Sequence, residues 1–180
     1  SSVSVLGAEF IEATAVQHFE ELVNVVPNLN WSGDGHRARY FQIRGVGELE
    51  QYQGAPNPSV GYIIDYIDFS GIGTVATLFD VGSIEVLRGS QGSRYGANAL
   101  GGLIYMRSSQ PSAERDGRLQ ATIGDDDART LGIAFGGSLN EFDTLLFRVS
   151  AQKHESNGFR DNTYLGRDDT NARDETGIRF

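Results

Sequence analysis

The side chains that could carry chemistry form only weak versions of known catalytic and cofactor patterns. Gly71–Ala76, GIGTVA, has the glycine spacing of a dinucleotide fingerprint, but Asp80 follows too soon for the long helix that the fingerprint needs. The glycine-rich run Gly89–Gly102 lacks the Lys-Ser or Lys-Thr pair of a phosphate loop. Arg88 precedes this run and Arg94 lies within it, so either could still hold an anion. A nucleotide-using enzyme is therefore the least favoured interpretation.

Histidines, nucleophiles and acidic clusters give no stronger signal. His18, His36 and His154 stand far apart without carboxylates at ligand spacing, and His18 is expected at a surface or edge of a helix. The chain has no cysteine and no G-x-S-x-G elbow. The aspartates after Lys153 lack the ligand order of an EF-hand and predict a solvated loop. We therefore expect no catalytic residues, no metal and no cofactor.

Composition narrows the class of protein further. The chain has 180 residues with 23 glycines and a net charge of −9, which disfavours both a helical bundle and binding to nucleic acid. Its start has neither the basic region nor the apolar stretch of a signal peptide. No apolar run approaches the roughly 18 residues of a membrane-spanning helix. Any membrane contact must therefore be made by β-structure.

Periodicity predicts short strands around one helix in the first 110 residues. A strand is expected near Val3 and Val5, followed by a helix that Thr14 and Gln17 would cap and Pro27 would end. Its apolar face comprises Phe19, Leu22, Val23 and Val26. We expect a hairpin over 28–44 with Ser32–Arg37 at its tip, and a second over Val60–Phe69 that turns at Asp65–Tyr66.

After Gln110 the pattern changes to alternation with a period of two. Three segments alternate apolar and polar residues, around Leu119–Ile123, Leu131–Phe135 and Leu145–Ala151, and turns separate them. Their length and alternation are those of transmembrane β-strands, although a water-soluble meander shows the same pattern. A long polar stretch follows, and Ile178 and Phe180 begin another strand.

Three motifs in order carry a resemblance to a known family. IRGVG at Ile43–Gly47, LFDV at Leu78–Val81 and IEVLRGSQGSRYGANALGGLIYM at Ile84–Met106 together resemble the plug domain of TonB-dependent outer-membrane receptors. The resemblance implies an α+β plug domain with a small mixed sheet over residues 1–110. It also implies that residues 111–180 are antiparallel β-strands and a long loop of an incomplete transmembrane β-barrel. Tyr66 departs from the family, which usually has glycine in that turn.

The resemblance also implies roles for particular residues. Arg44, Arg88 and Glu85 would lock the plug to the barrel, with the two arginines facing glutamates on the barrel wall; the alternative is local pairing of the arginines, for instance with Glu85. Glycines at six positions would shape the plug loops: Gly45, Gly89, Gly92, Gly96, Gly101 and Gly102. The candidate ligand-binding residues lie on outward loops: His36, Arg37, Glu50, Gln51, Tyr52 and Phe69.

For function, the resemblance implies an active-transport receptor of the Gram-negative outer membrane, with the plug inside the barrel lumen. Its small-molecule ligand would be a ferric siderophore, and uptake would be coupled to a TonB-type energy-transducing protein of the inner membrane. The segment that contacts this protein precedes the plug, and we expect it, like most of the barrel, to lie outside these residues. The alternative is a self-sufficient periplasmic α+β module that binds a carbohydrate or a partner protein.

Overall fold

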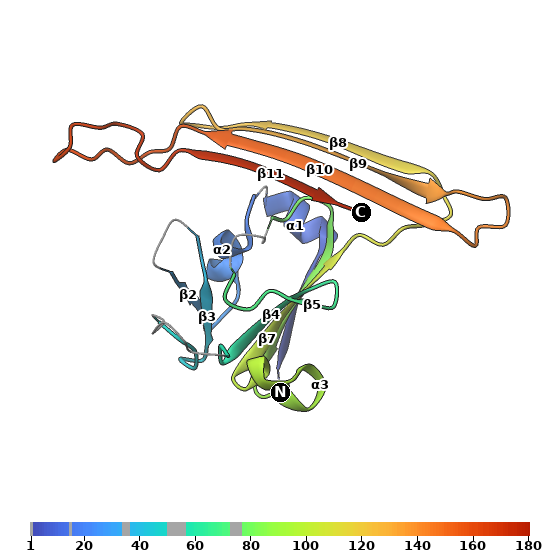
Figure 1. Cartoon of the computed structure of the whole chain (residues 1–180), viewed down its shortest axis with the longest axis horizontal. Coiled ribbons are helices and arrows are strands. Elements are labelled where there is room, and N and C mark those ends of the chain that lie inside the picture. Colours follow the sequence, from blue (N-terminus) through green and yellow to red (C-terminus); the bar gives the residue numbers. More distant parts are fainter. Residues whose placement is uncertain (1, 15, 34–36, 50–56, 73–76) are drawn as a thin grey trace. The chain divides into compact units, whose positions relative to one another are not determined.

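A mixed five-stranded sheet organises the first of two compact units, Ser1–Ser109 and Gln110–Phe180 (Figure 1). The computed structural model describes residues 2–14, 16–33, 37–49, 57–72 and 77–180. The sheet has the order β1-β6-β7-β4-β5, in which only β4 and β7 run parallel. Its strands are β1 (Val3–Gly7), β4 (Val60–Ile64), β5 (Ile67–Asp68), β6 (Val81–Arg88) and β7 (Gly102–Ser108).

Short helices and a separate hairpin complete the first unit. The hairpin pairs β2 (Leu29–Ser32) with β3 (Tyr40–Ile43), as the sequence predicts. The helical elements are α1 (Ala8–Thr14), α2 (Phe19–Leu22), η1 (Val23–Val25), α3 (Gly92–Tyr95) and η2 (Ala97–Ala99). The core forms where α2, β3 and β4 meet, with the rings of Phe19, Phe41 and Tyr62 at centroid distances of 5.3–5.9 Å.

The predicted helix is shorter than expected, and its start is different. All four residues of its apolar face are buried, but α-helix gives way to a 3₁₀ turn after Leu22. The N-cap is His18, whose Nδ1 accepts from the Glu20 N–H at 3.4 Å, so the Thr14–Gln17 capping box is wrong. The prediction of an exposed His18 is wrong as well, since pairing with Thr77 helps bury it to 1% exposure.

The Asp65–Tyr66 turn keeps the geometry that normally calls for glycine. Both residues have positive φ, 47° and 73°, as a two-residue type I′ hairpin requires. The Tyr66 ring packs edge-on against Tyr105 at 5.7 Å, and the Asp65 carboxylate accepts from the Ser108 N–H at 2.8 Å. These contacts offset a backbone cost of about 1–2 kcal/mol for a non-glycine residue.

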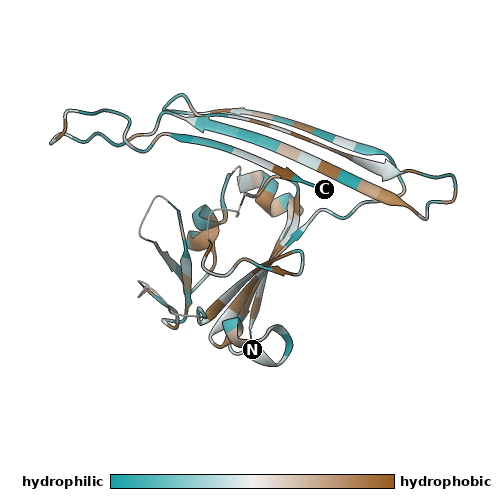
Figure 2. Ribbon diagram, in the orientation of Figure 1, coloured by the Kyte–Doolittle hydropathy of each residue, from teal (hydrophilic) through white to brown (hydrophobic). Residues whose placement is uncertain are grey.

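The second unit is a four-stranded antiparallel sheet in the order β11-β10-β9-β8. The predicted alternation is confirmed, and Figure 2 shows it along the strands. Apolar side chains of one face remain 49–86% exposed, namely Leu119, Ile123, Leu131, Ile133, Phe135 and Ile178. The strands are β8 (Asp116–Ile123), β9 (Arg129–Ser138), β10 (Leu146–Ser156) and β11 (Arg173–Arg179). No helix among the described residues is long and apolar enough to cross a membrane.

The long polar stretch is shorter than predicted, because β11 begins at Arg173 rather than near Ile178. The loop before it is organised by Asn171, which is 7% exposed. Its Oδ1 accepts hydrogen bonds from the N–H groups of Phe159 and Arg160, at 3.0 Å and 2.9 Å. A buried amide thus holds the two ends of the loop together.

Candidate functional site

The Glu48 carboxylate joins two described residues, Glu48 and Ser59, that lie on either side of residues 49–58 in the sequence. Glu48 accepts hydrogen bonds from the Ser59 N–H at 3.0 Å and 2.9 Å and from the Ser59 hydroxyl at 2.7 Å. The Glu48 carbonyl accepts from Ser32 Oγ at 3.0 Å and from Gln42 Nε2. Glu48 therefore joins both ends of this segment to each other and to the β2–β3 hairpin.

A buried carboxylate on α2 holds the tip of the β2–β3 hairpin. Glu20, 8% exposed, accepts hydrogen bonds of 2.7 Å from Arg37 Nη1 and from the Ala38 N–H. The Arg37 side chain is itself only 10% exposed, so its guanidinium lies within the unit. The Glu20 charge is thereby matched by a guanidinium and a backbone donor, as a buried carboxylate requires.

The segment after β5 is tied to the same region. The Phe69 N–H donates to the Tyr62 carbonyl at 2.8 Å, and its half-buried side chain packs against the main core. Arg39 Nε donates to the Gly71 carbonyl at 3.0 Å. Arg37 and Ala38 are therefore held by α2, whereas Phe69 is held by β4. Glu48 is tied to Ser59 and to the β2–β3 hairpin.

The two motif arginines both hold the first strand. Arg44 Nη2 donates to Ser2 Oγ at 2.9 Å, and Arg88 Nη2 donates to Ser4 Oγ at 2.8 Å and to the Pro27 carbonyl at 3.2 Å. The Arg88 N–H also donates to the Ser2 carbonyl at 3.0 Å. Arg88 is 7% exposed, whereas Arg44 is exposed and available to further partners.

Glu85 borders a cluster of tyrosines on the other side of the sheet from the main core. It pairs with Arg107 at 3.4 Å, and Arg107 lies over the Tyr105 ring at 4.8 Å. Tyr66 and Tyr95 pack against the same ring, at 5.7 Å and 6.0 Å. Burial, followed by the neighbouring Tyr66, raises the pKa of Tyr105 to about 12. Tyr105 therefore stays neutral throughout the physiological range.

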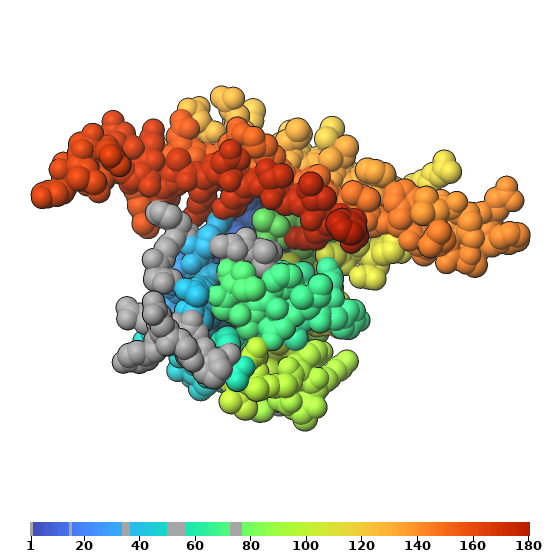
Figure 3. Space-filling model, viewed as in Figure 1, coloured from blue at the N-terminus to red at the C-terminus, as the bar shows by residue number. Residues whose placement is uncertain are grey.

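The glycine-rich run closes on itself between β6 and β7. The Gly89 N–H donates to the Gly101 carbonyl at 3.1 Å. Most residues between them lie on the surface of the first unit (Figure 3), but Ala99 is buried. Gly45, Gly89 and Gly96 have positive φ. A Cβ on Gly102 would lie 2.5 Å from Ile43 Cδ1, so that position has no room for a side chain. Backbone geometry and close approach thus account for glycine at these positions.

Asp68 ties the β4–β5 hairpin to this run. Its carboxylate accepts from the Ser70 N–H at 2.8 Å and from Asn98 Nδ2 at 2.7 Å. Burial acts to raise the pKa of Asp68, but the hydrogen bonds from Ser70 and Asn98 outweigh it and hold this pKa below its ordinary value. The ionised carboxylate is therefore the form that joins the two segments.

A family model described as the TonB-dependent Receptor Plug Domain matches residues 1–103. The chain belongs to the TonB-dependent receptor plug family. The first unit, with its mixed sheet and glycine-rich run, is the plug, and the exposed apolar sheet that follows comprises antiparallel strands of an unclosed barrel.

Curated relatives of this plug are receptors. The chain is 28% identical over 170 residues to the pesticin receptor of Yersinia pestis, covering 93% of this chain and 24% of that protein. It is also 35% identical over 78 residues to the metal-pseudopaline receptor CntO of Pseudomonas aeruginosa, covering 43% and 11%. The chain thus spans about a quarter of the length of the first of these relatives.

Solved structures of related receptors share the fold. The ferric yersiniabactin uptake receptor FyuA from Yersinia pestis superimposes with a TM-score of 0.70 at 27% identity, covering 86% of this chain and 24% of that one. The receptor FpvA from Pseudomonas aeruginosa, solved with pyoverdine bound, gives a TM-score of 0.72 at 19% identity, covering 89% and 23%. The FpvA likeness concerns the fold alone.

Two of the six predicted ligand residues lie within the part of the chain that the structure describes. Arg37 and Phe69 are described, and both are held by other residues of the plug, Arg37 by Glu20 and Phe69 by the core. The other candidates, His36, Glu50, Gln51 and Tyr52, lie outside the described residues. Among the lock residues, Glu85 pairs with Arg107, and the arginines hydrogen-bond to Ser2, Ser4 and Pro27.

Sequence reasoning gave neither Glu20 nor Glu48 the anchoring role that it has in the structure. Glu20 is one of two adjacent glutamates on α2, and Glu48 stands in a polar stretch, so neither differs locally from a solvated residue. Their partners, Arg37 and Ser59, become neighbours only when the hairpin and β4 come together. No local pattern in the sequence marks either pair.

Proposed function

We propose that this chain is the plug and N-terminal barrel portion of an outer-membrane receptor that imports a ferric siderophore. One observation supports it above all: a plug is followed directly by a sheet whose apolar face stays exposed. Such a face is stable where lipid replaces water. Similarity to the FyuA and CntO receptors supports a metal chelate as the ligand.

In this proposal the plug gates uptake through its first strand. Among the described residues β1 is an edge strand paired with β6, and Arg44 and Arg88 hold the residues at its start. A TonB-type energy-transducing protein that pulls on the segment before β1 would act first on these hydrogen bonds. Arg44, Arg88 and Glu85 would also lock the plug to the barrel, with the two arginines facing glutamates of the barrel wall, and exposed Arg44 is best placed for this.

The ligand would contact His36, Glu50, Gln51 and Tyr52 on the outward loops. Arg37 and Phe69 support this site indirectly, because both are engaged within the plug. Glu48 and Glu20 would fix the positions from which these loops meet the ligand. In this proposal the anchors lie inside the plug, and the side chains that contact the ligand belong to the loops.

The direct test is uptake of radiolabelled iron by cells whose only siderophore receptor is the full-length protein. With ferric yersiniabactin as the first probe, the triple substitution E50A/Q51A/Y52A should reduce uptake at least tenfold at unchanged receptor level. E141A/F142A, in the turn between β9 and β10, is the matched control and should have no effect. Full uptake by the triple variant would reject the role of this loop. Failure of the unmodified receptor to import ferric yersiniabactin or any other ferric siderophore tested would reject the proposed ligand class.

A further inference from the structure

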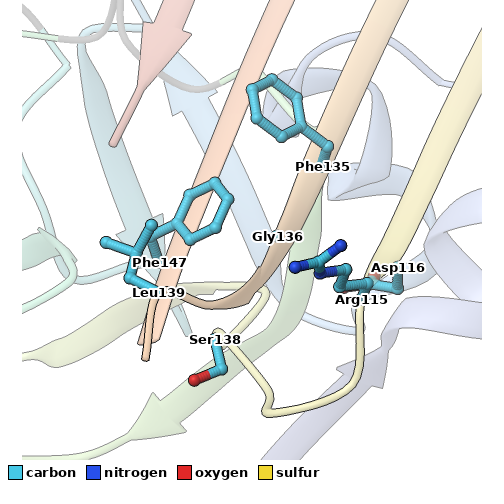
Figure 4. A pocket seen from close by; sticks show the side chains of 7 residues that line it. All are labelled: Arg115, Asp116, Phe135, Gly136, Ser138, Leu139 and Phe147. Carbon is cyan, nitrogen blue, oxygen red and sulfur yellow. The ribbon is translucent and has the colours of Figure 1, made fainter. Parts of the chain in front are cut away.

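A hollow of about 490 Å³ lies at one end of the second unit's sheet, where β8 begins. Its walls combine aromatic and aliphatic side chains with one arginine and one aspartate (Figure 4). The rings of Phe135 and Phe147 meet edge to face at 5.8 Å, and Leu139 stands beside them, 61% exposed. This volume lies within the range of small-molecule sites, and the lining combines apolar side chains with a few polar groups, as such sites do.

Arg115 is the cationic side chain in the lining of this hollow. Figure 4 shows its side chain reaching from the start of β8 toward β9, the strand that carries Phe135. A Cβ on Gly137 would lie 2.9 Å from Arg115 Cγ, so glycine at this position makes room for the arginine stem. The guanidinium has no hydrogen bond or ion pair with any residue that the structure describes. It is therefore free to bind a partner from outside the chain.

The other polar groups of the hollow are already engaged. Asp116 pairs with Arg148 Nη1 at 2.7 Å, which compensates its negative charge. The Ser138 hydroxyl donates to the Asn140 carbonyl at 2.7 Å. The net character of the hollow is thus one cation beside an apolar surface, which is complementary to an anionic group that carries hydrocarbon chains.

The position of the hollow identifies the anion. It lies at the end of the sheet with the β9–β10 turn, and the long loop before β11 lies at the opposite end. In outer-membrane barrels the short turns are periplasmic and the long loops extracellular. The leaflet at the periplasmic end consists of phospholipid. Resting on the proposed function, we propose that this hollow binds a phospholipid, with its phosphodiester on Arg115 and an acyl chain against Phe135, Phe147 and Leu139.

The test uses delipidated full-length receptor in detergent, with bound lipid counted by native mass spectrometry. The probes are phosphatidylglycerol, diacylglycerol with the same chains, and glycerophosphate without chains. The unmodified receptor should prefer phosphatidylglycerol, and Arg115→Gln should weaken it about tenfold, or ~1.4 kcal/mol. Arg115→Lys should retain part of the preference. Phe147→Ala should weaken both chain-bearing probes.

Arg129→Gln is the matched control. Arg129 lies on the same face of the sheet at its other end and is 4.0 Å from Asp127. Its loss should leave phosphatidylglycerol binding unchanged. Equal binding by the Arg115→Gln variant and the unmodified receptor would overturn the inference, and so would glycerophosphate binding as tightly as phosphatidylglycerol. If the receptor fractionates with the outer membrane, such a result rejects only the lipid site, whereas a receptor absent from that membrane rejects the proposed function.

Discussion

Replacing Glu20 by glutamine should release the tip of the β2–β3 hairpin. The carboxylate accepts two hydrogen bonds of 2.7 Å, one on each oxygen, from Arg37 and from the Ala38 N–H. Glutamine has only one acceptor oxygen, and its amide group would turn a donor toward one of these two donors. Losing one bond to a charged acceptor costs about 1.5–3 kcal/mol. This cost corresponds to roughly 10–150-fold more frequent local opening.

Hydrogen exchange on the full-length receptor measures this opening directly. In E20Q, a peptide that contains Ala38 should exchange roughly 10–150-fold faster, while β6 and β7 keep their rates. E21Q is the control, because Glu21 is the exposed neighbour on the same helix. If the Ala38 peptide exchanges at the same rate in E20Q and E21Q, the contact of Glu20 with Arg37 and Ala38 does not hold this part of the hairpin.

Three further outcomes follow from the plug. Y66G should be more stable than Y66A by about 1 kcal/mol in hydrogen exchange of β4, because only glycine relieves the positive φ; equal protection would contradict this. G102A should cost about 1–3 kcal/mol by crowding Ile43, whereas G7A, where nothing lies within 4 Å, should not; equal effects would count against the crowding argument. Because the folded pKa of Asp68 is lowered, its stabilisation is present above the unfolded value near 3.8 and is lost as pH falls further. The D68N variant should therefore show a flatter loss of β4–β5 protection below pH 4, and an unchanged acid profile would refute this assignment.

The strands of both units could be predicted because their signals are local. Alternation with a period of two marks β8, β9 and β10, and it requires only that one face of each strand meet a different medium. The glycine-rich run marks a close turn in the same way, through conformations that only glycine adopts freely. The β2–β3 and β4–β5 hairpins could be predicted because turn-forming residues separate two strand-like runs in each. These elements depend on neighbours in sequence, so the sequence displays them.

The helices and anchors could not be predicted because their causes are distant in sequence. α1 spans Ala8–Thr14 and buries only Ile11, so it shows no apolar periodicity. His18 is buried through its pairing with Thr77, which no pattern around residue 18 records. Glu48 gains its role from Ser59 in the same way. From the local sequence alone, His18 and Glu48 are expected to be solvated. Contacts with residues distant in sequence give them their positions in the fold.

The proposed function requires that the alternating apolar side chains of the second unit face lipid. Spin labels on single cysteines at Leu119 and Ile133, in full-length receptor reconstituted in bilayers, measure the medium that each position meets. Gln120 and Ser150, on the opposite face, are the matched positions. We expect high collision rates with oxygen and low rates with a water-soluble nickel chelate at Leu119 and Ile133 only. Equal accessibility to the nickel chelate on both faces would contradict this expectation.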